Sequence, residues 1–583
     1  MKLQAIIYPY VQSKSANELY YRSKSKINLL SYDKLKIDGL EKVCFDTYFN
    51  AFSLESWNYY TNIQSLSING SCTGPCIIQI FQRYKNTDGI TDQLVCERHV
   101  KKSQTWKLII PINQYKGICY LCVTPQSPGL ILSNISFMGE ISEGNNVSLA
   151  IVTCTYNREK EIKKNIQLIF QQIINSPSSV LYNKIKIFII DNGRTLCNDD
   201  FPISESINLI PNSNTGGSGG FTRGLIEVLQ QKQEYSFTHV LLMDDDIMIE
   251  PEALERTYSL LYALRKEYAN AFIGGAMLRK DQNYIQEECG AIWSGKINSL
   301  GKGVDLRSSN VLLENCVPSK ANYNAWWFCC MPLKMLDMSN LPLPFFIHGD
   351  DIEYGLRNCN GVILLNGICV WHDVFENKRN SILEYYDIRN YLIINSVYCN
   401  DYSIWKISFN LLKRFIANIF RMRYQDIHIG IQGIQDFLRG PQWWGKQDLV
   451  KLNNCLLSQA LKYEPFKEIM HPAGKIKKST QAFYLLTLNG AIFPKKKKVL
   501  CIPCGDSPYG LFRAKSAYLV DTNNKKAVHV KFSYKKCLIA YLEVLKALAQ
   551  LILQYKSKRS DYINHLSDLG SWEYWKRYYQ TPT

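Results

Sequence analysis

A short apolar run near the middle of the chain ends in three carboxylates. Residues His239 to Met243 are typical of a strand buried on both faces, and Asp244, Asp245 and Asp246 follow directly. Because side chains alternate along an extended segment, Asp244 and Asp246 are expected on one side and Asp245 on the other. Such like charges repel unless a cation, basic groups or solvent compensate them, which favours a divalent metal site. An acidic turn capping the next helix is the alternative.

The hydrophobic pattern predicts two further kinds of structure before this point. Residues 1–145 carry short β-prone runs separated by turn residues, which predicts an all-β sandwich. A sandwich fits a carbohydrate-binding module and equally a rigid structural or oligomerisation domain. From Val147 a strand to Thr155, a helical stretch from Arg158 and a second strand ending at Ile190 form a β-α-β pattern.

Polar residues stand at the ends of these expected parallel strands. In open parallel sheets, ligands bind outside the carboxyl ends of the strands. The residues expected to gather at this rim are Thr155, Asn157, Arg158, Asp191 and Asn192.

A glycine-rich stretch from Asn212 to Gly224 follows, with five glycines in nine residues. A glycine loop that opens a helix suits close approach of a phosphate, because its amides point outward without obstructing side chains. The stretch matches neither the P-loop nor the dinucleotide fingerprint, and a flexible linker is the alternative. Its position before a helix expected near Phe221, which leads to the acidic strand end, favours ligand binding.

Beyond residue 400 the sequence turns basic and helical. Residues 404–424 and 536–558 alternate bulky apolar side chains with Lys and Arg, and residues 494–498 read Pro-Lys-Lys-Lys-Lys. Such stretches fit an anionic membrane surface, and bundle helices with basic outer faces are the alternative. We expect peripheral membrane contact.

Composition narrows the class of protein. The 583 residues, 46% hydrophobic and 20% charged, indicate a folded chain of several domains, and the formal net charge of +17 predicts anionic partners. No apolar run of about 18 residues and no secretion signal are found, so we expect a cytoplasmic protein on the inner face of the membrane. The 19 scattered cysteines argue against a disulfide framework. Cys501 and Cys504 fit half a zinc site or two partly buried thiols.

Seven motifs occur in order between about residues 150 and 400: TCTYNRE, FIIDNG, NTGGSGGFTRG, LLMDDD, WWFCCMP, HGDDIEYGLR and VWHD. This order resembles the inverting galactofuranosyltransferases of glycosyltransferase family 2, which polymerise bacterial cell-wall galactan. The resemblance implies an α/β, Rossmann-like GT-A core over residues 146–400. An N-terminal β-sandwich over 1–145 and a mainly helical region over 401–583 complete the expected organisation.

The resemblance also implies roles for single residues. It adds His372 to Asp244 and Asp246 as ligands of Mn²⁺ or Mg²⁺, and it assigns the general base to Asp351. The residues expected at the donor are Arg158, Asp191, Asn192, Gly216, Gly217, Arg223 and Asp245, of which Arg223 rests on its place beside the glycine loop. Those expected at the acceptor are Trp326, Trp327, Glu288, His348 and Asp350. Two alternatives stay open: adjacent tryptophans usually belong to the hydrophobic core, and Asp350 also suits the cap of a helix.

The resulting hypothesis is metal-dependent transfer of galactofuranose from its UDP donor to a glycan acceptor, lipid-linked or free, in cell-surface polysaccharide synthesis. A rhamnosyl or galactopyranosyl donor on the same fold stays open, and so does a homo-oligomer. A non-catalytic carbohydrate- or nucleic-acid-binding protein would explain the charge but not the acidic cluster. We therefore expect no nucleic-acid partner.

Overall fold

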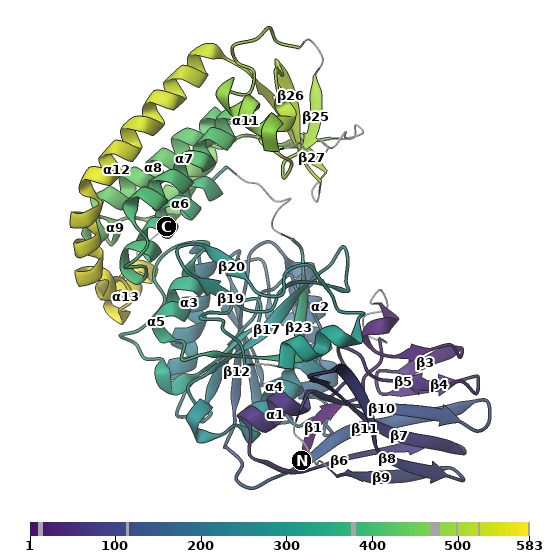
Figure 1. Ribbon diagram of the computed structural model, residues 1–583. Helices are drawn as coiled ribbons and strands as arrows, with labels where there is room; N and C mark the ends of the chain where they lie inside the picture. Colours follow the sequence, from purple (N-terminus) through teal and green to yellow (C-terminus); the bar gives the residue numbers. More distant parts are fainter. Residues whose placement is uncertain are drawn as a thin grey trace.

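Antiparallel sheets, a mixed α/β layer and a helical region follow one another along the chain in the computed structural model (Figure 1). The residues that the structure describes are 1–9, 16–111, 116–316, 318–374, 381–466, 478–496, 499–522 and 525–580.

Two antiparallel sheets form the N-terminal region, with the strand orders β3-β4-β11-β6-β9, to which β1 adds through β11, and β2-β5-β10-β7-β8. Inward residues alternate with outward ones, as Leu66 and Ile68 of β6 show, and both sheets contribute to one apolar core. The elements are β1 (Lys2–Ala5), β2 (Arg22–Ser23), β3 (Ile27–Ser31), β4 (Lys34–Ile37), β5 (Val43–Cys44), α1 (Leu54–Tyr60), β6 (Ile63–Cys72), β7 (Cys76–Asn86), β8 (Gly89–Val100), β9 (Gln104–Ile110), β10 (Ile118–Pro125) and β11 (Leu130–Ile141).

A central sheet with the order β14-β13-β12-β15-β22-β17-β18-β21 follows, and β23 pairs with β17 and β16. Strands β12 to β15 run parallel, while β22 is antiparallel to its neighbours. The elements are β12 (Leu149–Thr155), α2 (Glu159–Ile169), β13 (Ile185–Asp191), β14 (Ile207–Pro211), α3 (Gly216–Gln230), β15 (His239–Leu242), β16 (Met248–Ile249), α4 (Glu252–Ala263), β17 (Phe272–Arg279), β18 (Ile285–Glu288), β19 (Ala291–Trp293), β20 (Ile297–Ser299), β21 (Val304–Asp305), β22 (Cys329–Pro332), α5 (Asp350–Asn358) and β23 (Val362–His372).

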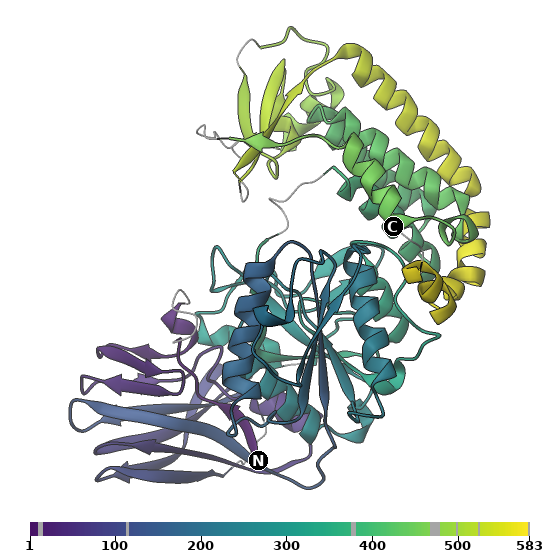
Figure 2. The same cartoon turned by 180° about the vertical axis from the view of Figure 1, so that it is seen from behind.

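Helices α2 and α3 cover opposite faces of this sheet (Figure 2). Ile151 of β12 belongs to the core beneath α2, and the next residue, Val152, belongs to the core beneath α3. Every residue of β13 and β23 is buried, as expected for strands covered on both sides. The continuous apolar runs in the sequence follow from this double covering.

The C-terminal region is a helical bundle that carries a small four-stranded sheet, β24-β27-β26-β25, which the sequence analysis did not anticipate. The long helix α12 runs from beside this sheet down to α13 at the central domain (Figure 1). The elements are α6 (Leu383–Tyr398), α7 (Ile404–Phe420), α8 (Tyr424–Arg439), α9 (Pro441–Trp444), α10 (Leu449–Gln459), β24 (Glu464–Pro465), α11 (Lys478–Leu486), β25 (Leu500–Pro503), β26 (Ser516–Asp521), β27 (Lys526–Lys531), α12 (Tyr534–Leu569) and α13 (Trp572–Gln580). The cysteines whose side chains the structure describes are free thiols.

The glycine-rich stretch is helical rather than a loop, because α3 begins at Gly216 instead of near Phe221. Its glycines permit close packing: a Cβ on Gly216 would lie 2.1 Å from the carbonyl oxygen of Phe346, and φ there is +71°. Gly217, by contrast, faces open space, with nothing within 4 Å of an added Cβ. The flexible-linker alternative is therefore wrong, and Gly217 is the glycine of this pair that leaves room for a ligand.

This difference predicts opposite effects for two neighbouring substitutions. Gly216→Ala forces a side chain against a backbone carbonyl in a left-handed conformation, so it should destabilise the fold by roughly 2 kcal/mol or more. Gly217→Ala should be neutral or stabilising by up to about 1 kcal/mol, because alanine favours helix. Midpoints of thermal unfolding measure both, and equal midpoints for the two variants would contradict the packing role of Gly216.

Candidate functional site

Three potential metal ligands meet at the carboxyl end of β15. One ligand atom each from Asp244, Asp246 and His372 lies within 4.8 Å of the other two. Nε2 of His372, at the end of β23, lies 3.1 Å from Oδ1 of Asp246. Asp245 is not part of this group; it lies with Asp246 in a bend after β15, and its Oδ1 contacts Arg158.

Neighbouring elements hold the acidic turn in place. Arg158, just before α2, places Nη1 3.0 Å from Oδ1 of Asp245 and 2.5 Å from Oδ2 of Asp246. Asn165 of α2 donates to the carbonyl oxygens of Asp245 and Ile247, both at 3.0 Å. Lys280 donates to the carbonyl oxygen of Asp246. Both the side chains and the backbone of the turn are therefore fixed.

Sequence reasoning missed Asn165 and Lys280. The one available signal was a polar residue on the buried face of α2, where Ile162, Asn165, Ile166 and Ile169 are all buried. A polar side chain in such a row is expected to have a hydrogen-bond partner, but its identity depends on contacts distant in sequence.

Burial dominates the electrostatics of the cluster. Burial raises the pKa of Asp244 to about 7. The negative charges of Asp246 and Asp245 also raise this pKa, whereas the positive charges of His372 and Arg158 lower it. Burial lowers the pKa of His372, but its contact with Asp246 outweighs this and the net shift is upward. Two carboxylates and one imidazole, with no thiol among them, form a donor set that fits Mn²⁺ or Mg²⁺.

A second acidic pair opens α5. Asp350 and Asp351 lie in its first turn, after Gly349 with φ of +84°. Oδ1 of Asp351 accepts a hydrogen bond of 2.8 Å from the amide of Ile352. Burial raises the pKa of Asp350 to about 7, and the charge of Asp351 contributes to this shift. Burial also raises the pKa of Asp351, to about 6. The hydrogen bond from the Ile352 amide favours the ionised form of Asp351.

Glu288 and His348 lie beside this pair. Glu288 is buried and accepts a 2.5 Å hydrogen bond from the Ser299 hydroxyl, and burial together with the charge of Asp351 raises its pKa to about 7. Nδ1 of His348 lies 2.7 Å from Oδ1 of Asp387 in α6. Asp387 in turn accepts from Arg414 of α7 at 2.7 Å, so the C-terminal helices orient His348.

The two adjacent tryptophans are core residues, with 5% of Trp326 and 6% of Trp327 exposed. The ring of Trp326 packs edge-on against Phe221 and Tyr354, and Nε1 of Trp327 donates to the carbonyl oxygen of Gly275 at 2.9 Å. Neither presents a free ring face, so their contact with an acceptor stays a prediction.

The residues predicted at the donor rim organise its loops. The carboxylate of Asp191 accepts from the amides of Gly193 and Leu196, at 2.9 and 2.8 Å. The Asn192 side chain donates to the carbonyl oxygen of Gly216 at 2.9 Å, which ties β13 to the start of α3. Arg223 instead pairs with Glu227 at 2.6 Å and lies on the outer side of α3, beside α13.

Comparison with known proteins defines the class. Residues 150–309 match the family model "Glycosyl transferase family 2", so this domain is a glycosyltransferase with the GT-A fold, and the prediction of an enzyme is confirmed. Residues 3–130 match "Galactofuranosyltransferase 2 N-terminal". Both matched regions are thus similar to glycosyltransferases of the kind that the motifs indicated.

Two curated relatives match across both regions. Galactofuranosyltransferase GlfT2 of Mycolicibacterium smegmatis is 22% identical over 441 residues, which cover 70% of this chain and 66% of that protein. GlfT2 of Mycobacterium tuberculosis is 23% identical over 441 residues, or 70% and 67% of the two chains. The match thus spans about two thirds of each relative's own length.

Removal of one ligand of the Asp244–Asp246–His372 cluster should weaken Mn²⁺ binding. We expect Asp246→Ala and His372→Ala to lower Mn²⁺ affinity by about 100-fold or more, since even supporting residues around metal sites contribute about 10- to 100-fold. Calorimetric titration with Mn²⁺ measures this. Asp245→Asn, outside the cluster, is the matched control and should keep most of the affinity; a parent-like titration of Asp246→Ala would disprove the site.

Proposed function

We propose that this chain transfers galactofuranose from UDP-galactofuranose to a hydroxyl of a glycan acceptor, with inversion at the anomeric carbon. The convergence of Asp244, Asp246 and His372 at the carboxyl end of β15 carries this proposal, because a diphosphate leaving group needs compensating charge there. Galactofuranose is proposed as the donor sugar because both relatives are galactofuranosyltransferases by name.

The donor side needs a stabilised leaving group. Asp244, Asp246 and His372 would hold Mn²⁺ or Mg²⁺, which when bound neutralises the charge that grows on the diphosphate. Arg158 compensates Asp245 and Asp246 and keeps the turn compact. Asp191 and Asn192 shape the rim on which the nucleotide would lie.

The acceptor side needs a base. Asp351 would accept the proton of the acceptor hydroxyl. The oxygen of that hydroxyl bonds to the anomeric carbon as the bond from this carbon to the UDP oxygen breaks. A single displacement of this kind inverts the anomeric configuration. Asp351 suits the role because the amide of Ile352 stabilises its ionised form, and Glu288 and His348 beside it would orient the acceptor.

A panel of nucleotide sugars tests the donor. Purified enzyme with Mn²⁺ and an oligosaccharide or lipid-linked acceptor should transfer sugar from UDP-galactofuranose and not from UDP-galactopyranose or dTDP-rhamnose. Product analysis by mass spectrometry and anomeric NMR reads out both transfer and inversion. Preferred use of another donor would reject galactofuranose while keeping the enzyme class.

Asp351→Asn should lower the transfer rate by roughly 10² to 10⁴, since it keeps the shape but cannot accept the proton. The neighbouring Asp350→Asn is the matched control and should cost less, while UDP affinity should hardly change in either. With the pKa of Asp351 raised to about 6, protonation should also reduce kcat/KM as the pH falls below about 6. A dead Asp350→Asn variant beside an active Asp351→Asn variant would reverse the assignment.

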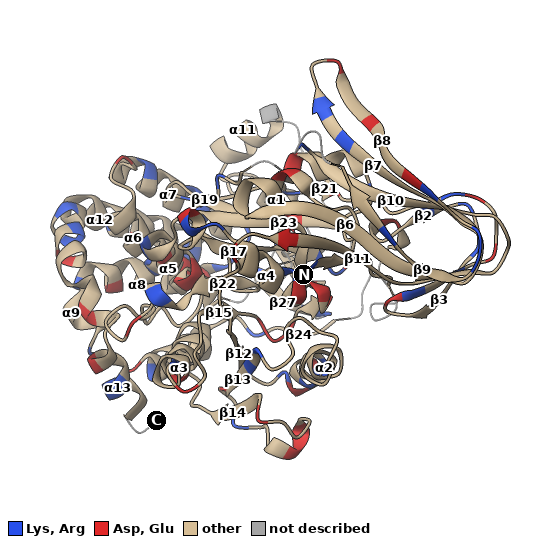
Figure 3. Ribbon diagram, turned by 90° about the horizontal axis from the view of Figure 1, so that it is seen from below, with Lys and Arg blue, Asp and Glu red and all other residues tan. Residues whose placement is uncertain are grey.

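We further propose that the helical region rests on the cytoplasmic face of an anionic membrane, where a lipid-linked acceptor would be presented. Exposed apolar side chains recur at one face of α12, where Leu538, Leu542 and Leu545 are 63%, 59% and 56% exposed. Trp405 and Phe409 of the packed helix α7 are 67% and 56% exposed. Basic residues accompany them on both helices (Figure 3), as a membrane interface requires.

Two details qualify the sequence-based membrane prediction. By length and composition α12 is apolar enough to cross a membrane, and 33% of its most apolar window is buried in the protein. In the basic run, the Lys495 ammonium donates a hydrogen bond to the carbonyl oxygen of Gly490 and lies over the ring of Phe532. Lys497 and Lys498 lie outside the described residues. The exposed stripe on α12 is therefore a stronger basis than the lysine run.

Leu538→Glu combined with Leu542→Glu should reduce flotation with anionic vesicles by at least about tenfold. Each change removes an apolar contact with the membrane and adds a negative charge that the anionic lipids repel. The matched control is Ile109→Glu on β9, where the side chain is 71% exposed but remote from α12. Equal flotation of all three proteins, or equal loss, would contradict docking through α12.

A further inference from the structure

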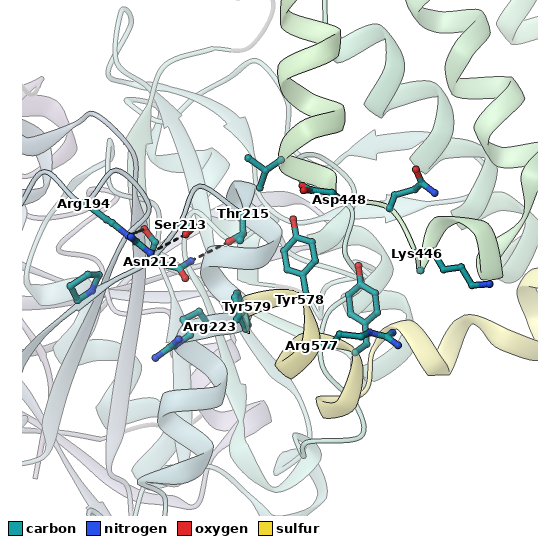
Figure 4. A pocket seen from close by; sticks show the side chains of 15 residues that line it. Arg194, Asn212, Ser213, Thr215, Arg223, Lys446, Asp448, Arg577, Tyr578 and Tyr579 are labelled. Carbon is teal, nitrogen blue, oxygen red and sulfur yellow. Dashed lines mark hydrogen bonds between the residues drawn. The ribbon is translucent and has the colours of Figure 1, made fainter. Parts of the chain in front are cut away.

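A cavity of about 380 Å³ lies where the edge of the catalytic domain meets the C-terminal helices (Figure 4). Its walls come from the loop after β14, the outer side of α3, the segment between α9 and α10, and α13. Asp244, Asp246 and His372 do not line it, so it is separate from the metal cluster. The size is that of a pocket for a small molecule.

The charge of this cavity is unbalanced. Arg194, Arg223, Lys446 and Arg577 line it from four separate segments, against one acidic residue, Asp448. The Asp448 carboxylate is already engaged, because it accepts from the Lys451 amide at 3.0 Å and pairs with the Lys451 ammonium at 3.2 Å. Arg223 is likewise paired, with Glu227, and basic residues still outnumber acidic ones in the lining, which suits an anion.

Arg194 and Arg223 are positioned before any ligand arrives. Arg194 donates from Nε to the carbonyl oxygen of Asn212 at 3.2 Å and from Nη2 to the Ser213 hydroxyl at 3.0 Å. Glu227 holds Arg223 by contacts of 3.0 and 2.6 Å. Planar guanidinium groups fixed in this way are suited to phosphate oxygens.

Two tyrosine hydroxyls in the cavity wall are buried and without a hydrogen-bond partner among the described residues, those of Tyr574 and Tyr578. Tyr574 as a whole is only 3% exposed, and its ring stacks parallel to that of Tyr578 with centroids 5.9 Å apart. The third tyrosine, Tyr579, donates to the carbonyl oxygen of Gly219 at 2.5 Å. The hydroxyls of Tyr574 and Tyr578 are shielded from solvent, so these tyrosines contribute their rings to the cavity wall.

We propose that this cavity binds the diphosphate group of an organic ligand, with the basic residues that line it on the phosphate oxygens. A nucleoside diphosphate and the diphosphate of a lipid-linked glycan share this chemistry, and only the lipid source rests on the proposed function. Since the walls belong to both α3 and α13, an occupant also ties the helical region to the catalytic domain.

Inorganic pyrophosphate tests the site in the full-length protein by calorimetric titration with EDTA present, so that metal-dependent binding at the donor site is removed. We expect saturable binding that Lys446→Ala combined with Arg577→Ala weakens at least tenfold. Lys576→Ala is the matched control, because this exposed residue neighbours Arg577 on α13 but does not line the cavity, and it should bind like the parent.

Competition identifies the source. Displacement of pyrophosphate by UDP would assign a nucleoside diphosphate, and displacement by a short polyprenyl diphosphate in micelles would assign the lipid headgroup. Absence of saturable binding, equal loss in the Lys576→Ala control, or pyrophosphate binding that neither organic diphosphate displaces would overturn the proposal. Glycosyl transfer is not part of this readout, so failure here leaves the proposed function untouched.

Discussion

Repulsion among three adjacent carboxylates at the end of β15 is the constraint on which the catalytic domain depends. Arg158 faces Asp245 and Asp246, while His372 reaches Asp246 from the far strand β23. Asn165 and Lys280 hold the carbonyl groups of the same turn. Arg158 and His372 thus compensate the charge of the acidic turn, while Asn165 and Lys280 fix its backbone.

The segment that carries Asp350 and Asp351 depends on the helical region in a similar way. The segment before α5 contains two non-glycine residues with positive φ, Phe346 at +74° and His348 at +63°. Arg389 of α6 donates to the carbonyl oxygen of Phe345 at 2.7 Å, and Asn390 donates to that of His348 at 2.6 Å. Because α6 holds this costly backbone conformation, the C-terminal helices help to position Asp350 and Asp351 as well as packing against the core.

The parts predicted correctly from the sequence are those set by local pattern. Continuous apolar runs correspond to doubly covered strands, and the acidic run does follow directly on one of them, with Asp244 and Asp246 grouped near His372. The parts missed depend on contacts distant in sequence. Gly216 packs against Phe346, 130 positions further along the chain, and Trp327 donates a hydrogen bond to the carbonyl oxygen of Gly275. No local pattern encodes either contact. The same holds for Asn165, whose two acceptors lie in the acidic turn.

Helix α3 links the two halves of the molecule through its glycines. An added Cβ on Gly224 would lie 2.2 Å from Val152 of β12, and one on Gly219 would come within 3.5 Å of Trp575 of α13. Small residues therefore let one helix approach both the sheet that carries the rim and the last helix of the chain. Since packed interiors yield little to added volume, a larger side chain at either position would separate α3 from one of its neighbours. The composition of this stretch thus reflects packing on several sides of α3, while an added Cβ on Gly217 would meet open space.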